Sequence, residues 1–471
     1  MGRPQFHSIN PATGAEWARF DGHSAAEVER ALAQAATSQA AWRGRSVGER
    51  TPLLRRIAEV LRAESQRWAR LISDEMGKPL SEAVGEIEKC AWTCDFYADA
   101  APVWLADRTV ASNATHSAVV FDPLGVVLAV MPWNYPFWQF FRFAAPALAA
   151  GNGVVLKHAA NVPQCALAIG DILAKAGCPD GLVQVLLIEP AQVAGLIADP
   201  RIAAVTLTGS TEVGAIVAGQ AGSALKKQVL ELGGSDPFIV LADADVERAA
   251  EVAVAARFVN NGQSCVNAKR FIVVDAVAER FVAAFVRGVA ALKVGDPLAV
   301  DTRIGPMARA NLREHLHDQV VRTLAAGAEL RLGGAPIEGP GFFYPPTVLD
   351  HVTPAMAAFR EETFGPVAAV IRAPDTDAAI ALANDTEFGL AAALWTEDVE
   401  RGRALARRID AGAVFVNGMS ASDARLPFGG IKRSGYGREL GEYGLREFVN
   451  VKTVWVGPAR MAAPSISKVD A

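Results

Sequence analysis

Cys265 is the residue in this sequence best suited to nucleophilic chemistry, because a cysteine thiolate attacks carbon centres readily. It ends the stretch GQSC (262–265) and is one of five cysteines in the chain. Free cysteine is also among the most buried residue types, and it then behaves as a small apolar side chain. The stretch alone therefore leaves two interpretations open, a nucleophile or a buried thiol beside a glycine-containing turn.

Two other polar residues stand inside or just after apolar runs. Asn134, in PWNYP (132–136), follows the apolar run 125–131. If that run is a strand of an open α/β sheet, the amide lies at the carboxyl edge where ligands bind and could donate to an oxyanion; an ordinary turn asparagine is the alternative. Glu231, in LELGGSDP (230–237), has apolar neighbours. It is either half of a buried ion pair or a general base whose pKa is raised by burial.

A strand-to-helix turn is predicted at TGSTEVG (208–214). Gly209 and Ser210 there would leave backbone N–H groups free at the positive end of a helix, where a phosphate binds. The stretch lacks the glycine spacing of the common dinucleotide fingerprint, so its signal is weak in isolation. The stretch REETFGP (360–366) is equally ambiguous, since a solvated pair of glutamates before a turn would have the same sequence.

The elements that would position these residues follow from the pattern of apolar residues. Apolar residues recur at helical spacing over 48–72, and the first hundred residues are predicted to be largely helical. Short apolar runs then alternate with helical segments over about 125–232 and again from 236 to about 430, which is typical of βαβ units on a parallel sheet buried on both faces. We predict two doubly wound α/β units, with 330–347 as a loop rich in glycine and proline.

Composition argues against several classes of protein. The chain has 471 residues, is 51% hydrophobic and carries a formal net charge of −5, which indicates no nucleic-acid partner. The first residues lack the apolar stretch of a targeting signal, and the longest strongly apolar window (124–133) is too short to span a membrane. The cysteines are scattered without a CxxC pair, so we expect neither a disulfide framework nor a metal site. These features favour a cytoplasmic protein with reduced thiols.

Seven motifs occur together in an order that resembles one family. Over about residues 9–456 the chain is similar to the NAD(P)-dependent aldehyde dehydrogenase superfamily, through PWNYP, Lys157 after the run GVVL, TGSTEVG, LELGGSDP, GQSC, EETFGP and PFGGIKRSGYGRELG (427–441). Within that superfamily, LKHAANVPQCA, DPFIVL and SDARLPFGG most resemble bacterial succinate-semialdehyde dehydrogenases. The resemblance implies an aldehyde dehydrogenase-like fold with two Rossmann-like domains.

The resemblance also implies how the chain is divided. The expected parts are a cofactor-binding domain at 1–108 and 123–233, a catalytic domain at 234–448, an oligomerisation element made of a β-hairpin at 109–122 and a C-terminal strand at 449–458, and a flexible tail at 459–471. Members of the family assemble through such a hairpin and strand, so we expect a homodimer or a homotetramer.

The same resemblance assigns Cys265 as the nucleophile, whose thiolate adds to an aldehyde to give a thiohemiacetal and, after loss of hydride, a thioester. The Asn134 amide and the backbone N–H of the nucleophile would stabilise the oxyanion. Glu231 would activate the water that hydrolyses the thioester. The implied cofactor-binding positions are Trp133, Lys157, Ala160, Gly209, Ser210, Gly214, Leu232, Glu362 and Phe364.

Ala160 bears on the choice of cofactor. Family members that use NAD commonly carry a glutamate three residues after the ribose lysine, and that glutamate repels the 2′-phosphate of NADP. Here the position is Ala160. We therefore predict that both NAD and NADP are used.

Substrate choice is predicted to depend on Arg142, at the position of a carboxylate-binding arginine of succinate-semialdehyde dehydrogenases. An ion pair between domains is the alternative for this residue. Some relatives carry a second such arginine where this chain has Val259, and Arg257 or Arg425 is a candidate replacement. Trp138 is a candidate for the wall of the aldehyde tunnel. The small-molecule substrate predicted is succinate semialdehyde; the alternatives are glutarate semialdehyde, a medium-chain aldehyde, and a binding or structural protein without catalysis.

Overall fold

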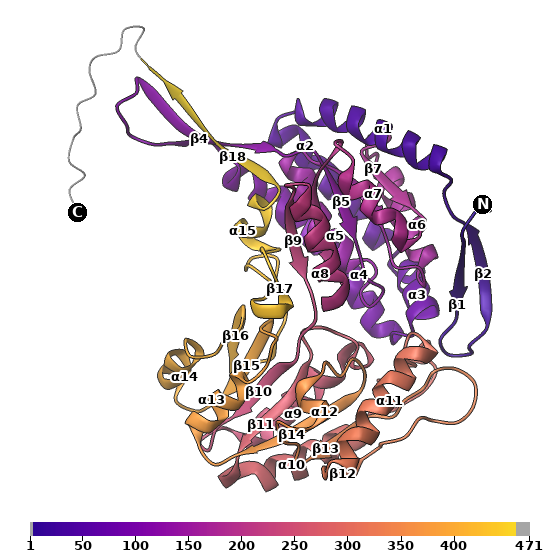
Figure 1. Cartoon of the computed structure of the whole chain (residues 1–471), viewed down its shortest axis with the longest axis vertical. Coiled ribbons are helices and arrows are strands. Elements are labelled where there is room, and N and C mark those ends of the chain that lie inside the picture. The colour runs from indigo at the N-terminus through magenta and orange to yellow at the C-terminus, as the bar shows by residue number, and fades with distance from the viewer. Residues whose placement is uncertain (1–2, 458–471) are drawn as a thin grey trace.

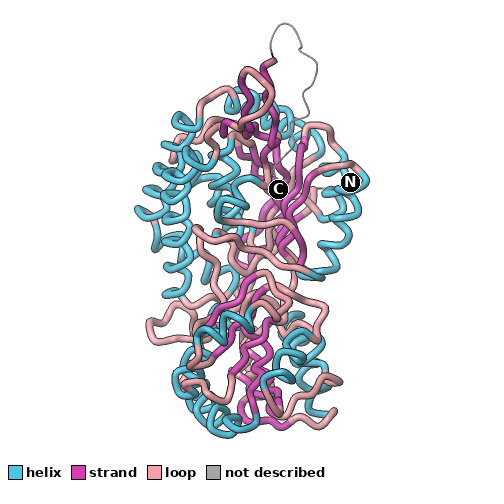
Figure 2. Tube along the Cα trace, turned by 90° about the vertical axis from the view of Figure 1, so that its left-hand side faces the viewer, coloured by secondary structure: helices cyan, strands magenta, loops and turns pink. Residues whose placement is uncertain are grey.

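The computed structural model describes residues 3–457, so the tail predicted at 459–471 lies outside the described residues. Figure 1 shows two α/β units, one above the other, with a narrow β arm projecting from the upper unit. In Figure 2, helices flank the strands of each unit on both sides, as a doubly wound fold requires. No helix within residues 3–457 is long and apolar enough to cross a membrane.

The N-terminal segment adds a β-hairpin and four helices to the upper unit. Their bounds are β1 (Gln5–Ile9), β2 (Glu16–Asp21), α1 (Ala25–Arg43), α2 (Val47–Ala63), α3 (Ser65–Met76) and α4 (Leu80–Trp104). The pattern predicted over 48–72 is helical, but it is divided at Glu64 between two helices. Helix α3 ends at Gly77, whose φ of 81° favours glycine.

A six-stranded sheet forms the centre of the upper unit, in the order β17-β9-β8-β5-β6-β7. Its strands are β5 (Val126–Val130), β6 (Gly153–Lys157), β7 (Val183–Leu186), β8 (Ile202–Thr208), β9 (Lys227–Glu231) and β17 (Gly435–Tyr436). Its helices are α5 (Trp138–Ala150), α6 (Pro163–Lys175), η1 (Pro190–Gln192), α7 (Val193–Ala198) and α8 (Thr211–Ser223). The chain order reverses between β5 and β8, and ligands bind outside the carboxyl ends of strands at such a switch point.

A seven-stranded sheet forms the lower unit, in the order β12-β13-β14-β11-β10-β15-β16. Its strands are β10 (Asp236–Val240), β11 (Ala268–Val274), β12 (Glu329–Leu332), β13 (Thr347–Asp350), β14 (Val367–Ala373), β15 (Ala391–Trp395) and β16 (Ala413–Val416). Its helices are α9 (Val246–Phe258), η2 (Val259–Gly262), α10 (Asp275–Ala290), α11 (Ala310–Ala325), α12 (Ala357–Arg360), α13 (Thr376–Asn384) and α14 (Val399–Ala406). All pairs are parallel except β12 with β13.

The projecting arm is a three-stranded antiparallel sheet of β3 (Arg108–Thr109), β4 (His116–Pro123) and β18 (Val449–Val456). Every residue of β18 pairs with one of β4, from Val449 opposite Pro123 to Val456 opposite His116. The arm leaves apolar side chains exposed on β18, among them Val451, Val454 and Trp455.

The segment after η3 (Lys432–Ser434) differs from the division expected from sequence. Residues 435–446 lie within the range assigned to the catalytic domain, yet β17 pairs with β9 in the six-stranded sheet, and α15 (Gly441–Arg446) packs on α4 and α5. The chain therefore returns to the upper unit before it enters the arm. The segment predicted as a loop at 330–347 also differs at its ends, because residues 330–332 belong to β12 and Thr347 begins β13.

Candidate active site

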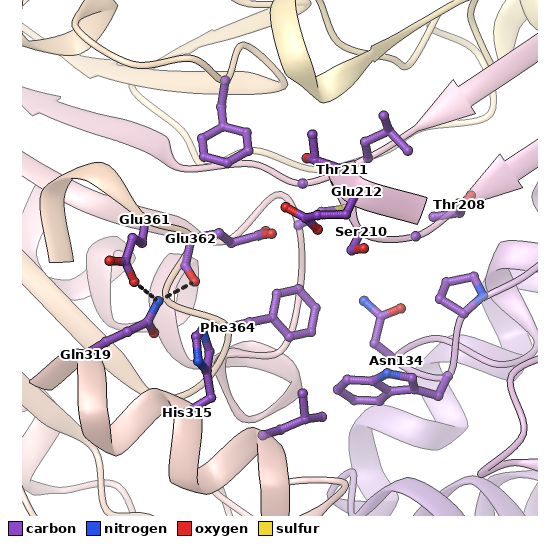
Figure 3. A pocket seen from close by; sticks show the side chains of 18 of the residues that line it. Asn134, Thr208, Ser210, Thr211, Glu212, His315, Gln319, Glu361, Glu362 and Phe364 are labelled. Carbon is purple, nitrogen blue, oxygen red and sulfur yellow. Dashed lines mark hydrogen bonds between the residues drawn. The ribbon is translucent and has the colours of Figure 1, made fainter. Parts of the chain in front are cut away.

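A cavity of about 450 Å³ lies between the two units at the switch point. The loop after β8 and the loop after β5 form one side of it, and α11 with residues 360–364 forms the other. Figure 3 shows Asn134, Ser210 and Thr211 on one side, with Glu362, Phe364 and Gln319 facing them.

A second cavity, of about 260 Å³, is lined by α4, α5, residues 419–428 and the loop of residues 259–267, called the nucleophile loop after the predicted role of Cys265. Two residues line both cavities, Gln139 and Cys265. Cys265 therefore lies where the two cavities meet.

The backbone conformation before Cys265 explains why the motif GQSC begins with glycine. Asn260, Asn261 and Gly262 all have φ between 57° and 70°, a left-handed run that turns the chain sharply after α9. A Cβ on Gly262 would lie 2.4 Å from the carbonyl oxygen of Gly365, so only glycine fits there. The turn delivers Cys265 to the edge of the seven-stranded sheet, just before β11.

Lys269 stabilises the nucleophile loop through hydrogen bonds to its backbone carbonyls. Its buried ammonium donates to the carbonyls of Ser264 at 2.9 Å and Cys265 at 2.8 Å, and lies 3.5 Å from Glu362 Oε1. Burial raises the pKa of Cys265 to about 12, while Arg142 and Lys269 act in the opposite direction. This environment favours the neutral thiol, so the predicted role as a nucleophile would require loss of its proton.

Asn134 is brought to the nucleophile loop. Its buried side-chain amide donates to the backbone carbonyl of Gln263 at 3.1 Å, and the backbone carbonyl of Asn134 accepts from the side-chain amide of Asn260 at 2.9 Å. Asn134 and Cys265 both line the first cavity. A buried and oriented amide on the same cavity wall as a thiol can stabilise an oxyanion formed on a carbon that the thiol attacks.

Glu231 ends β9 and is 2% exposed. Neither carboxylate oxygen has a hydrogen-bond partner within residues 3–457. Burial, with a further contribution from the nearby Glu439, raises its pKa to about 8, against the pull of Arg142 and Arg438. The sequence left two interpretations, half of a buried ion pair or a general base whose pKa is raised by burial. The raised pKa agrees with the second, and the role as a base stays a prediction. The side chain lines neither of the two cavities described above.

Most of the residues expected at the cofactor line the first cavity: Trp133, Gly209, Ser210, Leu232, Glu362 and Phe364. Ser210 caps α8 by accepting from the Val213 N–H, the first residues of this helix line the cavity, and a Cβ on Gly209 would meet only Leu207, at 3.6 Å. A helix of this length with an open glycine before it fits a dinucleotide phosphate.

Three of the expected cofactor residues lie outside the cavity lining. Gly214 supports the wall instead, since a Cβ there would lie 2.3 Å from Leu232 Cδ2. Lys157 ends β6 and is buried, which lowers its pKa, and Ala160 is exposed in the loop beyond. The neighbouring His158 hydrogen-bonds to the Pro136 carbonyl and the Ala159 N–H, so its ring is already engaged.

The substrate candidates are divided between the second cavity and the surface. Trp138 and Arg142 line the cavity, together with Val259. Arg142 is 2% exposed, pairs with Glu439 and donates to Thr208 Oγ1 at 3.3 Å. It is thus held in an ion pair, but the partner belongs to the segment that returns to the upper unit, so the pair does not join the two units as the alternative interpretation expected. Its role toward a substrate stays a prediction.

Neither proposed replacement for the second arginine lines the second cavity. Arg257 is fully buried and donates to four backbone carbonyls, those of Gly262, Thr363, Gly365 and Val367. The exposed Arg425 pairs with Asp423 at 2.6 Å. Arg257 is thus a structural support of the nucleophile loop.

Sequence reasoning missed several residues of the two cavities. Gln139 lines both, but it lies on a predicted helix with no motif around it. Lys89 and Ser422 line the second cavity although 333 positions separate them, so only the fold brings them together. Within residues 3–457, no group of His, Cys, Asp and Glu side chains could hold a metal ion.

Comparison with known proteins identifies the family. The model of the aldehyde dehydrogenase family matches residues 2–454. The chain is 52% identical over 449 residues to the probable NADP(+) succinate-semialdehyde dehydrogenase of Synechocystis sp., covering 95% of this chain and 99% of that one. It is 51% identical over 449 residues to the NAD(P)+ succinate semialdehyde dehydrogenase Sad of Escherichia coli K12, covering 95% and 97%.

Among solved structures, succinic semialdehyde dehydrogenase from Streptococcus pyogenes in complex with NADP+ superimposes with a TM-score of 0.94 at 36% identity, covering 96% of this chain and all of that one. The chain belongs to the aldehyde dehydrogenase family. The family and the fold class predicted from the seven motifs are confirmed.

Proposed function

We propose that this protein oxidises succinate semialdehyde to succinate with NADP or NAD as the hydride acceptor. The observation that carries the proposal is the position of Cys265 where two cavities meet, with the Asn134 amide on the wall of the first cavity. Relatives at about half identity that are named for this reaction support the choice of substrate and cofactor.

In the proposed reaction, the Cys265 thiol loses its proton to solvent water, and the resulting thiolate adds to the aldehyde carbon from the second cavity, which moves the carbonyl electron pair onto oxygen. The amide of Asn134 and the backbone N–H of Cys265 stabilise the negative oxygen of the thiohemiacetal. A nicotinamide dinucleotide bound in the first cavity supplies the hydride acceptor. What remains on the sulfur is then a thioester.

Glu231 is proposed to take a proton from the water that hydrolyses this thioester. A carboxylate with a pKa near 8 is a stronger base than an exposed glutamate, and its two oxygens have no competing hydrogen bonds among the described residues. Because the carboxylate lies outside both cavity walls, it needs a water molecule or a side-chain rotation to reach the thioester.

Cofactor contacts are proposed from the chain's own residues. The N-terminus of α8 with Gly209 and Ser210 would bind the pyrophosphate, and Glu362 the nicotinamide ribose. Lys157 would reach the adenosine ribose from the end of β6. The exposed Ala160 places no negative charge against a 2′-phosphate, which supports use of NADP as well as NAD.

Assembly and location are proposals of the same kind. The apolar side chains on β18 support assembly of the arm with other copies of the chain into a homodimer or a homotetramer. The cytoplasmic location expected from the sequence stays a prediction.

The function is tested by following cofactor reduction with a panel of aldehydes: succinate semialdehyde, glutarate semialdehyde and uncharged aldehydes of matching length. We expect the highest kcat/KM with succinate semialdehyde and no oxidation by C265S. Full activity of C265S would refute the mechanism, and a preference for an uncharged aldehyde would refute the substrate.

A further inference from the structure

The second cavity contains a cation that the proposed mechanism does not use. Lys89, on α4, lines this cavity, and its Nζ donates to Ser422 Oγ at 2.8 Å. The same Nζ lies 4.3 Å from the centroid of the Trp138 ring. An aromatic face and a hydroxyl thus hold the ammonium in the cavity wall.

The other charged groups of this wall already have partners. Arg142 is paired with Glu439. Of the two lining carboxylates, Glu86 pairs with Lys78, and Glu82 accepts from the Asn260 N–H at 2.6 Å. Lys89, by contrast, makes no ion pair with any residue in 3–457, so its charge is available to a ligand.

The electrostatic setting agrees with this arrangement. Burial, with a further contribution from the neighbouring Arg142, lowers the pKa of Lys89 to about 8, while Cys90, Asp423 and Glu86 oppose the shift. A ligand carboxylate beside the ammonium would restore the missing counter-charge and raise this pKa.

The wall of the cavity sets which ligand fits. Cys265 and Lys89 line the same cavity of about 260 Å³, and Val259, Met419 and Phe428 add apolar side chains to it. These surfaces match a short-chain aldehyde that ends in a carboxylate. Its aldehyde group would react at Cys265, its chain would contact the apolar side chains, and its carboxylate would lie at Lys89.

We propose that Lys89 is the specificity-determining residue that binds the far carboxylate of the semialdehyde, with Ser422 and Trp138 positioning its ammonium. The inference rests on the proposed function, because it takes the aldehyde to react at Cys265. It also accounts for the absence of an arginine at Val259: the cation is supplied from α4 instead.

The test compares succinate semialdehyde with butanal, which has the same chain length and no carboxylate. In K89M we expect the KM for succinate semialdehyde to rise ~30-fold or more, the loss that follows removal of one partner of a desolvated charge pair. We expect kcat with that substrate and both constants for butanal to stay within about threefold, because the reacting end is unchanged.

Three further variants make the result specific. K89R keeps the charge, so most of the affinity should return, which separates recognition from folding. S422A should raise the KM for the semialdehyde by a smaller factor. K175M is the matched control, since Lys175 also lies over an indole ring, that of Trp68, but lines neither cavity.

An unchanged KM for succinate semialdehyde in K89M, or an equal rise for butanal, would overturn the role of Lys89. A wild-type enzyme that oxidises butanal with a higher kcat/KM than succinate semialdehyde would instead overturn the proposed substrate. The two failures are distinguishable because the second appears before any substitution is made.

Discussion

Replacing Glu231 by glutamine should make the protein more stable and almost stop its turnover. The substitution keeps the shape of the side chain and removes its ability to ionise. In the folded protein the carboxyl group is 2% exposed and makes no hydrogen bond within residues 3–457, so its charged form is penalised. The glutamine amide carries no charge and so pays a smaller desolvation penalty than the carboxylate.

The size and sign of the stability effect follow from the pKa. Folding raises the pKa of Glu231 from 4.5 to about 8, so folding favours the protonated form. The contribution of protonated Glu231 to the free energy of folding is fully present below the unfolded-state pKa, and it is lost as the pH rises through the folded-state pKa. At ~1.36 kcal/mol per pKa unit, the wild type should be destabilised by a few kcal/mol (about 3–5) relative to E231Q above neutral pH, and by little near pH 4.5.

Two assays read out the two consequences. Thermal midpoints of E231Q and wild type, measured across this pH range, should coincide at acid pH and diverge as the pH rises. Rapid mixing with aldehyde and cofactor should show an undiminished first burst of reduced cofactor, followed by a steady state slower by about 10²–10⁴-fold, the usual contribution of a general base.

A pH-independent gap between the midpoints would refute the desolvated carboxyl group. Equal loss of burst and steady state would show that Glu231 acts before the thioester forms, for example on the Cys265 proton, and would refute its assignment to hydrolysis.

Three other substitutions test separate parts of the site. N134A should lower kcat/KM by about 10²–10³-fold through loss of an oxyanion donor, with the Kd for cofactor unchanged; a loss below tenfold would contradict that role. A160E should raise the KM for NADP by ~10-fold or more and leave that for NAD nearly unchanged, since a carboxylate there repels only the extra phosphate; equal effects on both cofactors would contradict the placement. G214A should displace Leu232 from the wall of the first cavity, because the added Cβ would lie 2.3 Å from Leu232 Cδ2. We expect the protein to lose about 1–3 kcal/mol of stability and the KM for the cofactor to rise. An unchanged thermal midpoint and an unchanged KM would contradict this steric role.

Much of the upper unit could be predicted from the sequence, because its strands are short apolar runs bounded by turns. The run GVVL and the Lys157 that follows it form β6 (Gly153–Lys157), and the next helical segment is α6 (Pro163–Lys175). Residues 435–446 could not be placed in the same way. Their two-residue strand has no periodicity, and only pairing with β9 reveals where they belong.

The site residues also separate into those that local sequence patterns predict and those that only the three-dimensional fold reveals. Cys265, Asn134 and Glu231 stand in short local motifs, and the fold brings the first two together beside one cavity. The environment of Arg142 depends on Glu439, almost three hundred positions away, and no local pattern announces that pair. Lys89 lies on a long helix where a lysine is usually a solvated charge, so its place in a cavity wall is visible only in three dimensions.

The return of the chain to the upper unit has a consequence for how this protein can diverge. Residues 428–456 place Phe428 in the second cavity, set Gly429 against the Glu231 carboxylate, supply Glu439 to Arg142, and continue into the projecting arm. One exchange of this segment would therefore alter the second cavity, the surroundings of Glu231 and the arm at once. We expect the proposed substrate range, hydrolysis and self-association to change together when this segment changes.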